Sequence, residues 1–309
     1  MEQTKTVDQL PKKSQLKMGK VTIVDSLTRE EFYRDYVAKN KPVVIRKMTK
    51  SWDALGWNAD YFKANEGGQK LAVKTGDVSQ GKRESVFLSE YVEALQQYEM
   101  DLKNNLNPAR PPYLHDVPFF HVFPKMKKDI EPFPLELFPK WYWHNWQNYI
   151  QFFMGATGSL TPLHFDTLYT NNLFFQIVGQ KRFILIPESQ TDLCYVHGWR
   201  WAGLNPDNPD FEKHPLAKDV KPLEVVIGPG DILFMPSGML HQVHGLSYSI
   251  SFNIDWHTPQ TAKKGVMSLF KGAPKQNVYY NFLSYLGLGL KVPSKHIFPY
   301  YKSYLNYVS

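Results

Sequence analysis

The stretch TPLHFDTLYTNNLFF, residues 161–175, sets a histidine and a carboxylate two positions apart among residues typical of buried β-structure. Side chains two apart on a strand project from the same face, so His164 and Asp166 point together while Phe165 points away. An imidazole and a carboxylate are two of the three ligands in the facial triad of non-haem iron sites. The simpler interpretation is a hydrogen-bonded polar pair at a strand end.

A third ligand would have to come from another strand. His241 follows the segment GDILFMPSGML and fits this role, with His244 as the alternative. On a regular strand these two histidines have opposite parity, so only one of them can face the metal. The HxD pair alone is a weak signal, and a second strand-borne histidine strengthens it. Spacing alone leaves a metal site and isolated, hydrogen-bonded histidines equally open.

A lysine supplies an independent test of an inward-facing site. In FFQIVGQKRFILIP, residues 179–180 are predicted to form the two-residue turn of a β-hairpin, with Val178 opposite Lys181. The residues sharing a face with Lys181 would then be Val178, Gln176, Phe174 and Asn172. An unpaired lysine on this apolar face would be costly, and an anionic ligand inside would remove that cost. The alternative is that Lys181 lies at the strand end and extends to water.

The elements that would position these residues are mostly short strands. Residues 21–48 predict a strand, a helix and a second strand, with Ser26 or Thr28 as the helix cap. Residues 105–150 are rich in proline and aromatic residues and predict an irregular, packed connection. From residue 149 onward, β-patterning and tight turns predict a mainly β fold with peripheral helices, either a sandwich or a barrel. An α/β fold is the alternative, but the second half lacks regular strand–helix alternation.

The two ends of the chain differ from the middle. Residues 1–20 are polar, lack the apolar centre of a signal peptide, and predict a flexible basic tail. Residues 21–257 would form one domain. Residues 258–309 predict a helical extension with many tyrosines, which suits packing or dimer formation.

Composition bounds the class of protein. The chain has 309 residues, 43% apolar and 21% charged, as in an ordinary soluble globular protein. Its single cysteine, Cys194, excludes an internal disulfide and favours an intracellular location, cytoplasmic or nuclear. No apolar run is long enough to span a membrane, so we expect no membrane association. The net charge of +7 permits contact with RNA, but no block of Arg and Lys is dense, and a solvated basic surface is the simpler explanation.

Five segments of the second half together resemble the JmjC-type 2-oxoglutarate oxygenases. These segments are TPLHFD, FFQIVGQKRFILIPESQ, NPDFEKHP, VVIGPGDILFMPSGMLHQV and SYSISFNIDW. More narrowly, they resemble the cupin-like hydroxylase branch, which includes the asparaginyl hydroxylase of hypoxia-inducible factor. The N-terminal segment NKPVVIRKMTKSWDALGWNADYF is also typical of that branch. The resemblance covers residues 20–257 in order and leaves the tail and the C-terminal segment out.

The resemblance implies a fold and a metal. The fold would be a double-stranded β-helix, a jelly-roll or cupin barrel with helices outside. Fe(II) would be held by His164, Asp166 and His241, with 2-oxoglutarate and O2 taking the remaining coordination positions. No protein nucleophile would be needed, because iron and the cosubstrate carry the chemistry.

The resemblance also implies a cosubstrate pocket. Lys181 would pair with the distal carboxylate of 2-oxoglutarate, and Thr161 and Tyr113 would donate hydrogen bonds to the same carboxylate. Asn172 and Asn253 match polar residues that line this pocket.

The sequence departs from the asparaginyl hydroxylase pattern at three places. The interval between the HxD pair and the lysine is two residues longer, so either Asn172 or Phe174 could occupy the family's asparagine position. Both have the right parity, and chemistry favours Asn172. His115 stands where the asparaginyl hydroxylase has a substrate-contacting glutamine, so amide recognition does not carry over. Residues 239–240 are Met-Leu where relatives often carry aromatic residues.

The implied activity is hydroxylation of a protein or peptide side chain by a 2-oxoglutarate-dependent dioxygenase. Hydroxylation of a tRNA base or of a small molecule is the second possibility. Histone demethylation is less favoured because the sequence has no Cys/His zinc cluster. A cupin-like binding module without turnover belongs to a different class, and the intact ligand set argues against it. By position, the C-terminal helices resemble the dimer element of relatives, so a homodimer is expected.

Overall fold

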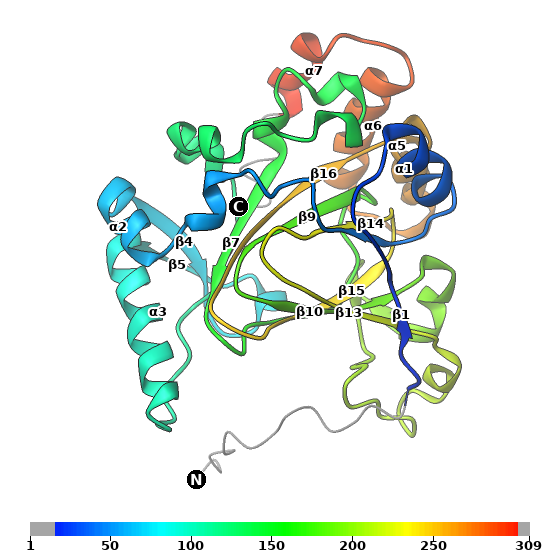
Figure 1. Ribbon diagram of the computed structural model, residues 1–309. Coiled ribbons are helices and arrows are strands. Elements are labelled where there is room, and N and C mark those ends of the chain that lie inside the picture. Colours follow the sequence, from blue (N-terminus) through cyan, green and yellow to red (C-terminus); the bar gives the residue numbers. More distant parts are fainter. Residues whose placement is uncertain (1–15, 302–309) are drawn as a thin grey trace.

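Two facing β-sheets form the centre of the computed structural model, which describes residues 16–301 (Figure 1). Sheet A has the order β1 (Gly19–Lys20), β13 (Leu223–Ile227), β10 (Lys181–Ile186), β15 (Leu240–Gly245), β8 (Leu160–His164), β12 (Trp201–Ala202) and β11 (Val196–His197). Sheet B has the order β2 (Thr22–Val24), β3 (Val43–Ile45), β14 (Ile232–Met235), β9 (Asn171–Val178), β16 (Ser249–Trp256), β7 (Ile150–Gly155) and β6 (Leu114–Val117).

The chain alternates between the two sheets from β7 to β10 and again from β13 to β16, while β10 and β13 both lie in sheet A and pair with each other. β7, β9, β14 and β16 lie in sheet B, whereas β8, β10, β13 and β15 lie in sheet A. The pairs within these eight strands are antiparallel. This alternation is the winding of a double-stranded β-helix, so the predicted jelly-roll barrel is confirmed.

The predicted hairpin at residues 179–180 is wrong. β9 and β10 do not pair with each other: Val178 pairs with Ile250 in sheet B, and Lys181 pairs with Ile227 and Gly245 in sheet A. The turn carries the chain across the barrel from one sheet to the other. Either connection turns alternate residues of both strands inward, so the expected inward orientation of Lys181 holds.

Aromatic side chains cover the outer face of sheet B. In β16, Phe252 and its alternate neighbours point outward into the larger hydrophobic cluster, whereas Ser251 and Asn253 point into the barrel. Trp52 stacks on Phe175 and Phe252, with ring centroids 5.5 and 5.9 Å apart. The irregular connection predicted over residues 105–150 adds further rings to this layer, so sheet B is buried on both faces.

Helices lie outside the barrel (Figure 1). The N-terminal part contributes α1 (Arg29–Phe32), α2 (Ala59–Glu66) and α3 (Leu88–Lys103), and a two-stranded ribbon of β4 (Lys70–Lys74) and β5 (Arg83–Phe87). Thr28 caps α1 in a capping box with Glu31, one of the two predicted caps. A short helix, α4 (Phe119–Val122), lies in the irregular connection. The C-terminal segment forms α5 (Pro259–Met267), α6 (Lys275–Leu288) and α7 (Ser294–Tyr301).

The two predicted terminal segments are only partly described. Of the basic tail expected over residues 1–20, residues 1–15 lie outside the described part of the chain, and β1 lies in the remainder. Residues 302–309 of the expected C-terminal extension also lie outside it. Between residues 16 and 301, none of the helices has the length and apolarity needed to cross a membrane.

The crossing between β9 and β10 depends on Gly179. Its φ is +71°, and a Cβ atom there would lie 2.0 Å from the carbonyl oxygen of Tyr248. Gly76 has a similar φ of +67° but no atom within 4 Å of the added Cβ. We expect Gly76→Ala to cost about 1–2 kcal/mol from backbone strain alone, and Gly179→Ala to cost at least about 2 kcal/mol more from the clash. Urea unfolding of both variants measures the difference, and equal costs would contradict the crossing geometry.

Candidate active site

A cavity of about 290 Å³ lies between the two sheets inside the barrel. Strands of both sheets contribute to its wall, so residues far apart in the sequence meet there. The predicted site residues that line it are His164, Asp166, His241, Lys181, Thr161, Tyr113, Asn172 and Asn253. Every residue predicted for the metal and the cosubstrate therefore reaches one cavity.

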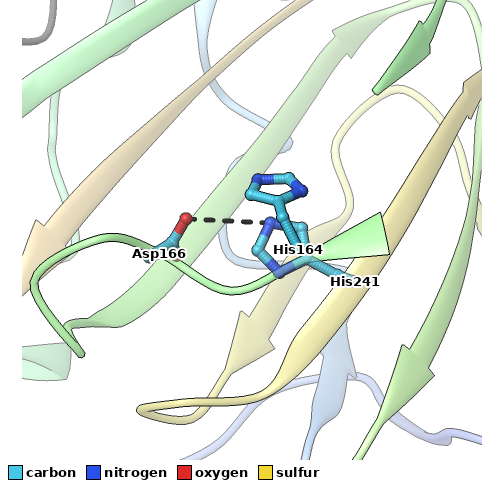
Figure 2. A group of neighbouring side chains, drawn as sticks. All are labelled: His164, Asp166 and His241. Carbon is cyan, nitrogen blue, oxygen red and sulfur yellow. Dashed lines mark ion pairs between the residues drawn. The ribbon is translucent and has the colours of Figure 1, made fainter. Parts of the chain in front are cut away.

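Two neighbouring strands of sheet A bring the three predicted metal ligands together. His164 ends β8 and pairs directly with His241 of β15, and Asp166 follows two residues after His164. One ligand atom from each side chain lies within 4.8 Å of the other two. The Nε2 atom of His241 is 3.7 Å from Oδ1 of Asp166 (Figure 2).

Backbone carbonyls orient both imidazoles. Nδ1 of His164 lies 2.8 Å from the carbonyl oxygen of Pro162, and Nδ1 of His241 lies 3.2 Å from that of Met239. A carbonyl only accepts, so each Nδ1 carries a hydrogen, and Nε2 is the nitrogen of each ring that is available to a metal. Burial and the neighbouring His241 hold the pKa of His164 well below its usual range, so this ring is neutral. Neutral imidazoles with Nδ1 fixed and Nε2 free are the form that binds a divalent metal.

His244 lies on the opposite face of β15 from His241. Its Nε2 is 2.7 Å from Oδ2 of Asp207, and the other oxygen of that carboxylate, Oδ1, accepts a hydrogen bond from Arg182 at 2.7 Å. The cluster therefore contains His241 and not the alternative, His244.

Asn172 connects two carboxylates at the end of the cavity. Its Nδ2 donates to Oδ2 of Asp166 at 3.2 Å and to Oδ1 of Asp255 at 2.9 Å. Burial, followed by the charge of Asp166, raises the pKa of Asp255 well above its usual range. Phe174 also lines the cavity, with its ring centroid 5.0 Å from Nζ of Lys181. The structure thus puts Asn172 beside the metal cluster and Phe174 beside the lysine.

Lys181 is a buried cation without an anionic partner. The side chain is 1% exposed, and Nζ donates to the hydroxyl of Tyr113 at 3.0 Å and to Oγ of Ser251 at 2.8 Å. None of the ion pairs found within residues 16–301 includes it. Burial lowers the pKa of Lys181 to about 7. The alternative in which Lys181 extends to water is wrong, and an anionic ligand would supply the missing charge.

A second charged group, formed by Lys74, His115 and Asp116, also lines the cavity. Nζ of Lys74 donates to Oδ2 of Asp116 at 3.0 Å, and Nδ1 of His115 is 2.7 Å from the same oxygen. Burial lowers the pKa of His115 to about 4. Burial alone would raise the pKa of Asp116, but His115 and Lys74 outweigh it and hold that pKa well below its usual range. Nε2 of His115 lies 3.5 Å from Oγ1 of Thr161, so this group contacts a predicted cosubstrate residue.

Sequence reasoning missed several residues of the cavity. They are Lys74, Asp116, Thr167, Arg200, Ser251 and Asp255. For Ser251 and Asp255 a signal was present, because both share parity with Asn253 in the alternating segment SYSISFNIDW. No pattern marks Lys74 or Asp116, since their meeting depends on how the β4–β5 ribbon packs beside β6.

Comparison with known proteins agrees with this geometry. The cupin-like domain family matches residues 29–262. The chain is 26% identical over 253 residues to tRNA wybutosine-synthesizing protein 5 of Gallus gallus, covering 77% of this chain and 78% of that protein. It is 29% identical over 254 residues to the 2-oxoglutarate and iron-dependent oxygenase JMJD4 of Gallus gallus, covering 75% and 59%. It is 28% identical over 247 residues to the lysine-specific demethylase JMJ30 of Arabidopsis thaliana, covering 74% and 53%.

The residues matched by the family include the eight strands of the double-stranded β-helix and the residues that line its cavity. The chain belongs to the cupin-like domain family, within its JmjC-type members. It spans little more than half the length of the oxygenase and demethylase relatives.

The burial of Lys181 makes the stability of the protein depend on pH. Its pKa is about 7 in the folded state against 10.5 when unfolded, so between these values the unfolded chain binds more protons and stability rises with pH. Lys181→Met removes this dependence. Between pH 7 and 9.5, we expect the free energy of unfolding of the wild type to rise by on the order of 3 kcal/mol relative to that of the variant.

Urea unfolding at the two pH values, without 2-oxoglutarate, measures the effect. The same substitution at exposed Lys213 is the matched control and should leave the profile of the wild type unchanged. Parallel profiles for the wild type and Lys181→Met would show that Lys181 keeps its proton throughout this range.

Proposed function

We propose that the protein is an Fe(II)- and 2-oxoglutarate-dependent dioxygenase that hydroxylates a side chain of a protein substrate. The observation that carries the proposal is one cavity containing both a His-Asp-His cluster and a buried, unneutralised lysine. A metal site alone would not need the lysine, and an anion site alone would not need the cluster. The relative named a 2-oxoglutarate and iron-dependent oxygenase supports the same class of activity.

Different residues of the cavity would bind the metal and the cosubstrate. His164, Asp166 and His241 would hold Fe(II) through three positions and leave the others open. Bound iron and 2-oxoglutarate would supply the oxidising chemistry, in which O2 oxidises 2-oxoglutarate to succinate and CO2 together with a C–H bond of the substrate.

The lysine end of the cavity would bind the cosubstrate. Lys181 would pair with its distal carboxylate, and the hydroxyls of Tyr113 and Thr161 would donate to the same group. The carbonyl oxygen of the Asn253 side chain is buried without a hydrogen-bond partner among the described residues, which suits a polar ligand. Asn172 is also proposed as a cosubstrate contact, although its amide nitrogen already bonds to Asp166 and Asp255.

Three other substrate classes and one role without turnover are the alternatives to a protein substrate. A tRNA base is supported by the relative named tRNA wybutosine-synthesizing protein 5 and by the net charge of +7. Removal of a methyl group is supported by the relative named a lysine-specific demethylase. A small molecule is a further substrate class. A binding module without turnover is disfavoured, because the His-Asp-His cluster and the lysine are all in place.

We also propose that the protein forms a homodimer through its C-terminal helices. Apolar side chains in this segment remain exposed, with Phe270 at 80% and its neighbours at about half. These side chains are Met267, Leu269, Phe270, Tyr279 and Phe282. An exposed apolar patch of this kind marks an interaction surface.

Anaerobic addition of Fe(II) and 2-oxoglutarate tests the metal and cosubstrate sites together. We expect a visible charge-transfer absorbance for the wild type, its loss in His164→Ala and in His241→Ala, and its retention in His244→Ala. The last variant is the matched control, because His244 lies on the same strand but faces Asp207. Loss in His244→Ala with retention in His241→Ala would show that the wrong histidine has been assigned.

Mass spectrometry of substrate pools tests the substrate class. Peptides and tRNA are incubated with enzyme, Fe(II) and 2-oxoglutarate, with His164→Ala as the inactive control. We expect peptides to gain one oxygen atom in a 2-oxoglutarate-dependent manner. Oxygen gain in tRNA alone, or loss of methyl groups from peptides, would contradict the proposed substrate class. If no pool yielded succinate, the proposed oxygenase activity would be wrong.

A further inference from the structure

The turn that follows β8 carries Asp166, and both of its ends bond to other segments: the N–H of Phe165 donates to the carbonyl of Arg200 at 3.2 Å, and the hydroxyl of Ser237 donates to the carbonyl of Tyr169 at 2.5 Å. The carbonyl oxygen of Asp166 accepts a hydrogen bond from the backbone N–H of Tyr169 at 2.9 Å, which closes the turn. Tyr169 has a φ of +57°, a left-handed conformation that is costly for a residue other than glycine. The carboxylate of Asp166 receives one hydrogen bond within the described structure, from Asn172 at 3.2 Å. Its direction therefore depends on the backbone of the turn.

Two side chains from other parts of the chain donate to the middle of this turn. Nδ2 of Asn277 lies 3.1 Å from the carbonyl oxygen of Thr167 and 2.8 Å from its Oγ1. Nε1 of Trp199 donates to the same carbonyl oxygen at 3.0 Å. The two donors occupy both lone pairs of that carbonyl, so the peptide between Thr167 and Leu168, one residue beyond Asp166, is fixed in its plane.

Asn277 belongs to α6, a helix outside the barrel (Figure 1). It is fully buried, so its amide is not competing with water for Thr167. An amide nitrogen carries two hydrogens, and here one can go to each oxygen of Thr167. Helix α6 packs mainly against α5 and α7, and Asn277 is its hydrogen-bonded contact with the turn beside the cavity.

We infer that Asn277 is a positioning residue for the metal site: through Thr167 it fixes the turn that aims the carboxylate of Asp166. This inference rests on the proposed function for its consequence, because the aim of Asp166 matters to a metal bound with His164 and His241. Groups that orient metal ligands contribute about 10–100-fold to metal affinity. The C-terminal helices are by this argument part of the site although none of them reaches the metal cluster.

The test compares two identical substitutions on α6. Asn277→Leu removes the donor to Thr167 while keeping a side chain of similar size. Asn281→Leu is the matched control, because Asn281 lies one turn later, is equally buried and forms no hydrogen bond with Thr167. Anaerobic calorimetric titration of the full-length proteins with Fe(II) should show about tenfold weaker binding for Asn277→Leu. Asn281→Leu should bind Fe(II) like the wild type, whatever its effect on stability.

A second readout does not need the metal. Hydrogen exchange of the Tyr169 amide in the metal-free protein should be faster in Asn277→Leu than in Asn281→Leu, because that amide closes the turn. Trp199→Phe, which removes the other donor to Thr167, should change Fe(II) affinity and exchange in the same direction, and it decides the question if Asn277→Leu does not fold.

The outcomes separate the inference from the proposed function. Equal Fe(II) affinity and equal Tyr169 exchange in the two leucine variants would overturn the role of Asn277. If the wild type itself binds no Fe(II), the proposed function fails, and exchange at Tyr169 still decides whether Asn277 holds the turn.

Discussion

The aromatic layer on the outer face of sheet B is the contact on which the rest of the structure depends. A strand turns alternate side chains to opposite faces, so β16 can present Ser251 and Asn253 to the cavity only while Phe252 and its neighbours find apolar partners outside. Trp52 supplies such a partner by stacking on Phe252 and Phe175, and Phe133 packs against Trp52 and Phe175. Much of the apolar burial therefore lies outside the barrel, and a second cluster around Phe174, Phe183 and Leu185 lies between the sheets. Together they offset the cost of the charged and polar groups in the cavity.

The charges inside the cavity are unequally compensated. Lys74 and His115 face Asp116 at 3.0 and 2.7 Å, so that end of the cavity is internally paired. Lys181 has only hydroxyl partners. The side chains of His164, Asp166 and His241 direct their possible ligand atoms toward one another. The unpaired cation and the unshared lone pairs define two binding requirements, one for an anion and one for a metal. A single dicarboxylate cosubstrate that also contacts the metal would meet both, which is why the two features are most simply explained together.

Local alternation made part of this site predictable from the sequence. The HxD pair, and the expectation that only one of His241 and His244 faces the metal, follow from side-chain parity, which depends only on residues two or three apart. The family resemblance, and not parity, assigns His241. Strand pairing, in contrast, could not be predicted from local alternation. The glycine between β9 and β10 fits both a hairpin and a crossing, and what decides is the packing of Gly179 against the Tyr248 backbone, a residue far along the chain. The inward direction of Lys181 was still correct, since parity does not depend on which partner the strand takes.

The remaining parts of the site could not be predicted from the sequence, because they depend on tertiary packing. Asp116 reaches Lys74 only because the β4–β5 ribbon lies beside β6. Thr167 has no motif of its own, and its importance comes from two donors, Asn277 and Trp199, that no spacing rule connects to it. The turn that Thr167 occupies joins β8 to β9 and carries Asp166. A turn has backbone freedom to lose on ordering, so contacts from outside the barrel help to hold a ligand in place. The hydrogen bonds from Asn277 and Trp199 supply such contacts, and a helix outside the barrel is thereby connected to the geometry of a residue inside it.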